Sequence, residues 1–321
     1  YARRNDLQPP KSVVYCKNLF SREAVQMGLK RDYIEFIGSM LIFGTNGLLV
    51  TNIPLSSAQI VLTRTFFGSI FLLCVVLARR QLSLKQFKGD ELPVLISGIC
   101  LGANWVFLFE AYKYASVSIG TLVYYCGPII VMALSPVLFK EKLTWNKLAA
   151  ITAVIIGMVC ITGVAGAEGS TGRGILCAAV AALLYATLIV SNKSIKPVSG
   201  LGSTLSELII GFFVILAYLL IKGEFPCALP GGRPLVYVLI LGVVNSGFAC
   251  FLYFSSMQRL PGQTVALCCY VDPLSAVIFS ALFLGERMTP VQMIGAALIL
   301  GGAMFGEIKF GGRRRALEEK K

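Results

Sequence analysis

The sequence predicts an all-α integral membrane protein with ten transmembrane helices, arranged as an inverted repeat of five plus five. Three observations support this prediction: an apolar composition, ten apolar runs of membrane-spanning length, and a motif that recurs 145 residues further along the chain. Of the 321 residues, 56% are hydrophobic and 14% are charged, with a mean hydropathy of +0.76. Ordinary soluble domains carry about 25% charged residues, so a bilayer is the expected solvent.

The ten apolar runs set the predicted helices. A helix rises about 1.5 Å per residue and the bilayer core is about 30 Å thick, so a spanning helix needs roughly 20 apolar residues. Runs of this kind occupy residues 33–51, 57–78, 92–112, 117–139, 145–164, 174–191, 203–222, 234–254, 261–284 and 289–308. The connections are too short to hold a second, soluble domain.

Lysine and arginine predict the orientation, because cytoplasmic segments near span ends carry the excess of these residues. With the N-terminus inside, 23 of the 29 basic residues lie in inner segments and five in outer loops, while Arg64 lies within a span. The basic tails 1–32 and 309–321 are therefore both expected in the cytoplasm, and the protein in the cytoplasmic membrane.

Composition also argues against several kinds of protein. The net charge of +13 is spread over short gaps between apolar runs, whereas a nucleic-acid binder needs a basic face. Histidine is absent, and eight of the ten cysteines lie within apolar runs without metal-ligand spacing, so neither a metal nor a cofactor is expected. No phosphate-binding loop of the G-x-x-x-x-G-K-[ST] kind is present, which excludes direct use of ATP through that motif.

The duplication rests on shared proline, glutamate and threonine positions rather than on shared apolar letters. Three pairs keep the offset of 145: Pro128 and Pro273, Glu141 and Glu286, Thr144 and Thr289. The copies, assigned to residues 33–164 and 174–308, begin five helices apart. Five is an odd number, so equivalent segments face opposite ways across the membrane. Secondary transporters commonly have this architecture, with the binding site near the midplane between the halves.

The acidic residue of the motif has a structural interpretation. Thr289, Pro290 and Gln292 form the signature of a helix start, with an N-cap threonine, a first-turn proline and a glutamine that bonds back to the cap. Glu286 comes just before this helix, where the partial positive charge of the N-terminus favours a carboxylate. Glu141 stands in the same relation to Thr144. We therefore favour a turn-fixing role over a transport role for both acids.

The paired helix-loop-helix segments Pro128…LFKEKLT and Pro273…LFLGERMT, followed by a Gly-rich helix, resemble the EamA repeat of the drug/metabolite transporter superfamily. The resemblance extends over residues 33–308, although Lys140 in the first copy stands where the second has Gly285. It implies ten helices in a five-plus-five inverted repeat, a central substrate cavity, and export or exchange of small metabolites such as amino acids.

Two ionisable residues lie deepest in the predicted spans, where charge is costly and usually faces a cavity or a partner. Arg64 fits either the anionic group of a substrate or a structural partner such as backbone carbonyls or lipid headgroups. Asp272 precedes Pro273, whose missing N–H frees a carbonyl and kinks the helix, so it could hold a cation, an ammonium group or a proton, or cap a broken helix. Its equivalent in the first copy is Gly127. Glu110 and Glu207 lie nearer to span ends.

Polar and aromatic residues in the middle of spans complete the predicted cavity, because each needs a partner for its polar atom. They are Asn46, Asn104, Trp105, Tyr124, Tyr125, Tyr185, Asn245 and Tyr270. Each one alone is also compatible with a hydrogen bond between helices. Together they suggest a cavity for an amphipathic organic molecule rather than for a bare ion.

The leading functional hypothesis is a secondary transporter of small organic metabolites that works by alternating access, with a coupling proton at Asp272. Its expected partners are the metabolite and the lipid bilayer. A lipid scramblase or a structural membrane protein is the alternative, since grooves and inverted repeats occur there too. An intramembrane enzyme is disfavoured, because histidine is absent and Asp272 has no second intramembrane aspartate.

Overall fold

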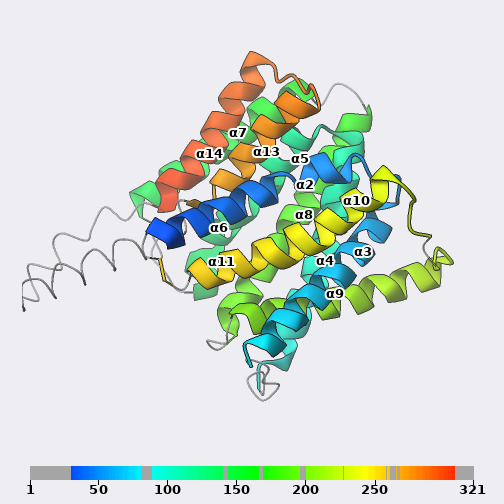
Figure 1. Ribbon diagram of the computed structural model, residues 1–321. Coiled ribbons are helices and arrows are strands. Elements are labelled where there is room, and N and C mark those ends of the chain that lie inside the picture. Colours follow the sequence, from blue (N-terminus) through cyan, green and yellow to red (C-terminus); the bar gives the residue numbers. More distant parts are fainter. Residues whose placement is uncertain are drawn as a thin grey trace, which may run out of the picture.

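The computed structural model shows a bundle of long helices (Figure 1). It describes residues 30–80, 89–139, 144–165, 169–195, 200–226, 228–257, 259–260, 265 and 268–307. Every regular element within these ranges is a helix. Residues 30–44 form the first helix, and the following elements are α2 (Asn46–Val50), α3 (Ser57–Ala78), α4 (Glu91–Tyr114), α5 (Val117–Tyr124), α6 (Gly127–Phe139), α7 (Trp145–Ala165), α8 (Gly169–Ser194), α9 (Gly200–Lys222), α10 (Arg233–Leu239), η2 (Ile240–Phe248), α11 (Ala249–Met257), α13 (Val271–Phe283) and α14 (Pro290–Glu307).

The chain is a multi-pass membrane protein. Seven helical stretches in the described residues are long and apolar enough to cross a bilayer: Lys30–Val50, Ser57–Ala78, Glu91–Tyr114, Val117–Leu138, Thr171–Ser194, Leu201–Lys222 and Arg233–Met257. Three shorter apolar helices, Trp145–Ile161, Val271–Phe283 and Pro290–Gly306, lie in the remaining predicted spans. The count of ten membrane crossings therefore stays a prediction.

Several spans predicted as continuous helices are interrupted. The first helix stops at Gly44 and α2 starts after Thr45. In the span predicted at 117–139, α5 ends at Tyr124 and α6 begins at Gly127. In the span predicted at 261–284, α13 begins only at Val271. Hydropathy predicts the length of a span but not the continuity of its backbone, so these breaks have no signal in the apolar pattern.

The eighth predicted span contains a π-helical stretch, η2, between α10 and α11. Ser246 Oγ donates a 3.0 Å hydrogen bond to the carbonyl of Leu241, five residues earlier. Gly242 and Gly247 allow this stretch to approach α3, since a Cβ on Gly242 would lie 2.6 Å from the Cβ of Phe67. Widened turns of this kind often occur at functional sites.

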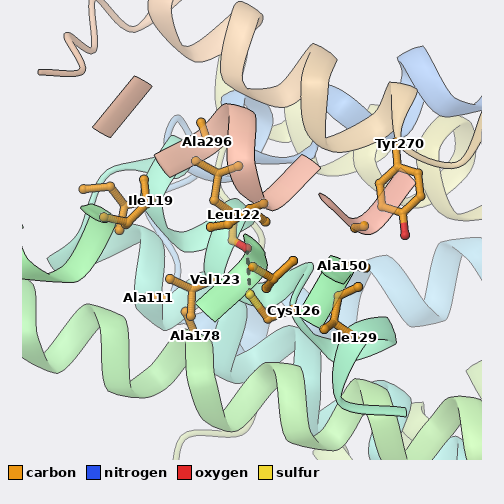
Figure 2. Close-up of a cluster of buried hydrophobic side chains, with 14 of the residues drawn as sticks. Ala111, Ile119, Leu122, Val123, Cys126, Ile129, Ala150, Ala178, Tyr270 and Ala296 are labelled. Carbon is orange, nitrogen blue, oxygen red and sulfur yellow. Dashed lines mark hydrogen bonds between the residues drawn. The ribbon is translucent and has the colours of Figure 1, made fainter. Parts of the chain in front are cut away.

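A buried apolar cluster joins the first half of the chain to its last helix (Figure 2). Leu122 and Val123 of α5, at 0% and 1% exposure, pack with Ala150 of α7 and with Ala296 and Ile299 of α14. The Cys126 thiol bonds the Leu122 carbonyl at 3.6 Å, which is the dashed line in Figure 2. Two elements far apart in the sequence thus share one core.

Close backbone contacts occur in matching pairs. A Cβ on Gly68 of α3 would lie 2.8 Å from the Cβ of Ser246 and 3.4 Å from the Gly242 carbonyl oxygen. On α9, a Cβ on Gly211 would lie 3.4 Å from the Gly98 carbonyl oxygen and 3.5 Å from the nitrogen of Gly102, both on α4. Small residues allow helix backbones to approach closely in membrane proteins. The α3–η2 and α9–α4 contacts therefore use the same device.

The helices α7 and α14 lie side by side at one edge of the bundle, while α9 lies toward the opposite edge (Figure 1). A Cβ on Gly157 would lie 2.7 Å from the Gly295 carbonyl oxygen, and a Cβ on Gly295 would lie 2.8 Å from that of Gly157. Gly302 similarly meets Ala153 at 2.9 Å. No other residue type fits this crossing without a shift of one backbone.

Candidate functional site

A cavity of about 410 Å³ lies between the helices. Its walls come from residues 30–44 and from α2, α3, α4, α5, α8, α9, α11 and α13, whereas neither α7 nor α14 contributes a residue to it. This volume falls in the range of small-molecule sites, which are mostly apolar with a few placed polar groups. The cavity is therefore the candidate binding site.

Seven of the ten candidate residues predicted from the sequence line this cavity: Asn46, Arg64, Trp105, Tyr124, Tyr125, Tyr185 and Asp272. They come from six different parts of the chain, and the fold brings them to one space. Asn104, Asn245 and Tyr270 do not line it. These three polar side chains are used inside the protein instead.

Arg64 forms the positive side of the cavity. Its side chain is only 2% exposed, and its guanidinium carbon lies 3.7 Å above the centre of the Trp105 ring. Its Nε donates to Ser246 Oγ at 2.9 Å, and no carboxylate of the described residues forms an ion pair with it. A cation–π contact of a desolvated cation contributes about 2 kcal/mol. The terminal N–H groups of the guanidinium have no hydrogen-bond acceptor among the described protein atoms, so they can donate to an anionic group in the cavity.

Asp272 forms a negative side of the same cavity. It lies in the first turn of α13, directly after the break, and its carboxylate accepts a very short hydrogen bond from the Tyr125 hydroxyl. Tyr125 lies at the other break, between α5 and α6. The two interrupted spans thus meet through this bond. Discontinuous helices near the midplane are where membrane transporters commonly place substrate and ion sites.

An aromatic wall lies next to Asp272. The rings of Tyr124 and Tyr185 stack with their centroids 4.8 Å apart, and Tyr125 meets Tyr124 edge to face at 5.4 Å. Aromatic faces give large apolar contact area with defined geometry. The cavity can therefore hold an organic side chain as well as charged groups.

The three candidates outside the cavity stabilise its walls. Asn104 is fully buried, donates to the Cys100 carbonyl at 2.6 Å, and accepts from the Tyr124 hydroxyl at 3.4 Å. Asn245 of η2 donates to the Ile42 carbonyl at 2.8 Å and to Asn46 Oδ1 at 3.2 Å, which fixes the break in the first span. The side chain of Tyr270 belongs to the apolar cluster of Figure 2, which explains its absence from the cavity.

The predicted structural residues can also be located. Thr289 and Gln292 exchange two hydrogen bonds at the start of α14, at 2.9 and 3.3 Å, with Pro290 as the first helical residue. Glu286 does not bond this helix. It accepts from the backbone N–H groups of Val117 at 2.7 Å and Ser118 at 3.0 Å, at the start of α5. Glu141 lies outside the described residues.

The cavity contains polar residues that the predicted set lacked: Tyr112, Thr121, Asn192, Thr204, Glu207 and Tyr253. Glu207 is the one that changes the electrostatics, because it adds a second acid. A signal in the sequence could have identified it: Glu207 precedes Gly211 by four residues, as Arg64 precedes Gly68. In contrast, Glu110 bonds Ser57 Oγ at 2.7 Å and lies 3.4 Å from Lys113 Nζ, away from the cavity.

Metal ligands do not cluster here. Among the described residues, no group of three or more cysteine, aspartate, glutamate or histidine side chains could hold a metal ion. The eight cysteines that the structure describes are free thiols. The chemistry of the cavity is therefore that of hydrogen bonds, charges and aromatic faces.

Comparison with known proteins points to transport. The model of the EamA-like transporter family matches residues 32–163 and again residues 172–305. The chain is 28% identical to the uncharacterized transporter YxxF of Bacillus subtilis over 89% of this chain and 92% of that protein. It is 26% identical to an uncharacterized transporter of Archaeoglobus fulgidus, over 83% and 92% of the two chains. One solved crystal structure superimposes with a TM-score of 0.60 at 21% identity, covering 86% of this chain and 97% of that one, which shows a shared fold.

Proposed function

Because this chain belongs to the EamA-like transporter family, we propose that it is a secondary transporter of small amino-acid-like metabolites in the cytoplasmic membrane. It works by alternating access and acts as an exporter or exchanger. The observation that carries the proposal is the cavity itself, in which the Arg64 guanidinium, the Asp272 carboxylate and a tyrosine wall face one space of about 410 Å³.

The charges of the cavity match a zwitterion. A solute carboxylate fits the free terminal N–H groups of Arg64, since arginine binds carboxylates through parallel hydrogen bonds. A solute ammonium group fits Asp272, whose carboxylate has one donor in Tyr125. Arg64 and Asp272 form no ion pair with each other within the described residues, so a solute does not have to break one. The apolar part of the solute contacts Tyr124 and Tyr185.

Alternating access is supported by the internal symmetry of the contacts. The family model matches the chain twice. Gly68 meets Gly242 and Ser246, and Gly211 meets Gly98 and Gly102. Gly211 follows Gly68 by 143 residues, and Gly242 and Ser246 follow Gly98 and Gly102 by 144 residues. The same contact therefore occurs twice, with the roles of the two halves exchanged. Two like halves that face opposite ways allow one site to open to either side of the membrane.

The lining residues favour an opening on the side of the N-terminus. The cavity includes Asn192 near the end of α8, Thr204 near the start of α9, and Met257 at the end of α11. With both termini in the cytoplasm, these helix ends lie on the cytoplasmic side. At the other end, Glu286 binds the start of α5 and Gly47 packs against Val117, where a Cβ would lie 2.2 Å from a valine methyl. We infer a state closed to the outside.

Exchange assays in proteoliposomes test the function. The full chain is reconstituted into vesicles loaded with unlabelled amino acids, and the entry of each radiolabelled amino acid is followed. We expect saturable exchange of at least one amino acid that Arg64→Met abolishes and that Arg287→Gln, a change at an exposed turn residue, leaves intact. Lipid scrambling without saturable exchange of any solute would overturn the proposal in favour of a scramblase.

A further inference from the structure

A second polar cluster lies at one end of the cavity and joins three helices. Ser97 of α4, Asn192 of α8 and Glu207 of α9 meet there, and Ser203 Oγ lies 3.4 Å from the same carboxyl oxygen. Ser97 is fully buried and Glu207 is 5% exposed. Both Asn192 and Glu207 line the cavity, so the cluster communicates with the solute space. It lies on the side of the helix ends that we assign to the cytoplasm.

The distances in this cluster leave a place for a hydrogen on the carboxyl group of Glu207. Ser97 Oγ lies 2.7 Å from Asn192 Oδ1 and 2.8 Å from Glu207 Oε1, both within the range of O–H···O bonds. A hydroxyl carries one hydrogen, so it donates to only one of these oxygens. If Ser97 donates to the Asn192 carbonyl, the carboxyl group of Glu207 must carry the hydrogen that joins it to Ser97. A neutral Glu207 therefore completes the network.

Burial away from a basic partner also favours the neutral form of Glu207, against the hydrogen bonds with Ser97, Asn192 and Ser203, which favour the charged form. Among the described residues, no lysine or arginine forms an ion pair with it, although it lies in a membrane-spanning helix. Of the helices packed against α9, α4 presents uncharged Ser97, α11 presents the Cys250 thiol, and α3 carries Arg64 in the same cavity. From α8, uncharged Asn192 bonds Glu207. An unpaired buried carboxylate costs several kcal/mol in a medium of low dielectric.

We propose that Glu207 is a proton-binding site of the transporter, distinct from Asp272, and that the proton it takes up from water at the cytoplasmic end of the cavity favours solute binding at Arg64. This proposal rests on the proposed transport function and names its coupling group. With Glu207 neutral, and with Asp272 bonded to Tyr125 and assigned to the solute ammonium group, the charge of Arg64 is left to the solute carboxylate. With Glu207 ionised, that charge is compensated within the cavity and the solute binds less tightly. Binding of the proton and binding of the solute therefore help each other, to the same degree in both directions. Proton and solute then cross the membrane together, which fits the exchanger of the two proposed modes.

Infrared spectroscopy tests the proton site without any solute. The carbonyl stretching band of protonated carboxyl groups is recorded on the reconstituted full chain during a pH titration. We expect a component that disappears as the pH rises, that is missing in Glu207→Gln and that remains in Asp272→Asn. Identical titrations of the wild type and Glu207→Gln would overturn the proposal.

A second variant keeps the test meaningful if Glu207→Gln does not fold. Ser97→Ala removes the oxygen that bonds the carboxyl group and leaves Glu207 in place, so we expect the same band at a shifted frequency. The titration is repeated in sodium chloride and in choline chloride. A band that responds to sodium at constant pH would overturn the proton as occupant in favour of a metal cation.

Solute binding tests the coupling separately. The probe is the labelled amino acid that exchanges best, and its affinity is measured across the same pH range. We expect the wild-type affinity to fall roughly tenfold, a typical coupling, as the pH rises through the titration of the band, and that of Glu207→Gln to stay constant. A constant affinity in the wild type would overturn the coupling. If the band titrates but no amino acid exchanges, the proton site stands and the proposed transport function fails.

Discussion

The helices α3 and α9 occupy corresponding places in the two halves of the chain, yet one places a basic side chain in the cavity and the other an acidic one. Gly68 on α3 and Gly211 on α9 each contact a small-residue pair on a helix of the other half. Four residues before these glycines stand Arg64 and Glu207, and both line the cavity. The backbone contact is repeated in both halves, whereas the side chain that faces the solute is not.

The two interrupted spans show the same pattern, with a shared backbone and different side chains. The break before Gly127 and the break before Asp272 lie 145 residues apart, but only the second carries an acid. A Cβ on Gly127 would lie 2.8 Å from the Tyr185 ring and 2.9 Å from the Ala182 carbonyl oxygen. Position 127, directly after the first break, therefore has no room for a side chain. The duplication accounts for the scaffold, and the positions where the copies differ account for the chemistry.

The largest effect on solute binding is expected at Arg64, the residue in which α3 differs most from α9. Arg64→Met removes the charge and keeps most of the apolar stem. A charged hydrogen bond contributes about 1.5–3 kcal/mol, so we expect binding of the exchanged amino acid to weaken roughly 10- to 100-fold. Equilibrium binding to the protein in detergent measures this loss.

The thermal stability of Arg64→Met is the control, because it separates a loss of binding from a loss of folding. The substitution removes a buried charge that has no carboxylate partner among the described residues. We expect the relieved desolvation cost to offset the lost Trp105 contact and Ser246 hydrogen bond, so that the thermal unfolding midpoint changes little. Arg64→Lys keeps the charge but loses the planar stack on Trp105, and we expect intermediate affinity. Wild-type affinity in Arg64→Met would contradict the assignment of the positive side of the cavity.

The next effect is expected at the two breaks. Asp272→Asn keeps a partner for the Tyr125 hydroxyl but removes the negative charge, and we expect amino-acid exchange to slow about tenfold with little change in stability. Gly127→Ala leaves all charges in place and forces a shift of Tyr185 or of α8. We expect it to lower the free energy of unfolding by about 1–3 kcal/mol. Exchange rates and thermal melting, measured on both variants, separate chemistry from packing, and a reversed pattern would contradict the comparison.

Gly68 and Gly211 occupy equivalent positions in the two halves but differ in how tightly they are packed. A Cβ on Gly68 is too close to Ser246 at 2.8 Å, whereas a Cβ on Gly211 finds ordinary contacts at 3.4 Å or more. We expect Gly68→Ala to destabilise the protein by about 1–3 kcal/mol and Gly211→Ala to cost less than about 1 kcal/mol. Melting curves of the two variants measure the difference. The matched control is Gly38→Ala, where a Cβ meets no atom within 4 Å.

The smallest effect is expected at Glu286. Glu286→Gln keeps an acceptor for only one of the Val117 and Ser118 N–H groups, because each bonds a different carboxylate oxygen, and it loses the charge that favours the N-terminus of α5. We expect a loss of about 1 kcal/mol in stability, typical of a carboxylate at a helix start. Arg287→Gln, a neighbouring exposed change, should leave the melting curve as it is. Equal melting curves for both variants would show that the carboxylate charge does not stabilise this contact.

The sequence predicted the class of the protein and most of the polar cavity for a simple reason. Ionisable and aromatic side chains in the middle of a span need a partner, so Arg64, Asp272 and the three cavity tyrosines were selected on physical cost alone. The direction of a side chain around its helix was not available, because these helices are apolar on all sides. Tyr270, which faces a core instead, was therefore included with the rest.

Contacts between residues far apart in the sequence could not be predicted either. The sequence placed Glu286 next to the start of α14, the nearest helix along the chain, whereas the structure places its carboxylate at α5, 168 residues away from Ser118. Helix breaks were missed for a related reason. Apolar residues continue on both sides of Thr45 and of Tyr125, so the sequence gives no sign of the helix ends that the structure has there.

The crossing of α7 and α14 has a mechanical consequence. The two helices meet backbone to backbone at Gly157 and Gly295, and neither contributes to the cavity. Their outer faces expose apolar side chains such as Val159 and Met293, at 64% and 61%, which suit lipid. Two backbones this close cannot move apart or bend independently without losing their contact. Probes on α7 and α14 should therefore report one constant distance between the two helices while the solute is picked up and released. The pair is then a built-in ruler against which the travel of every other helix can be measured.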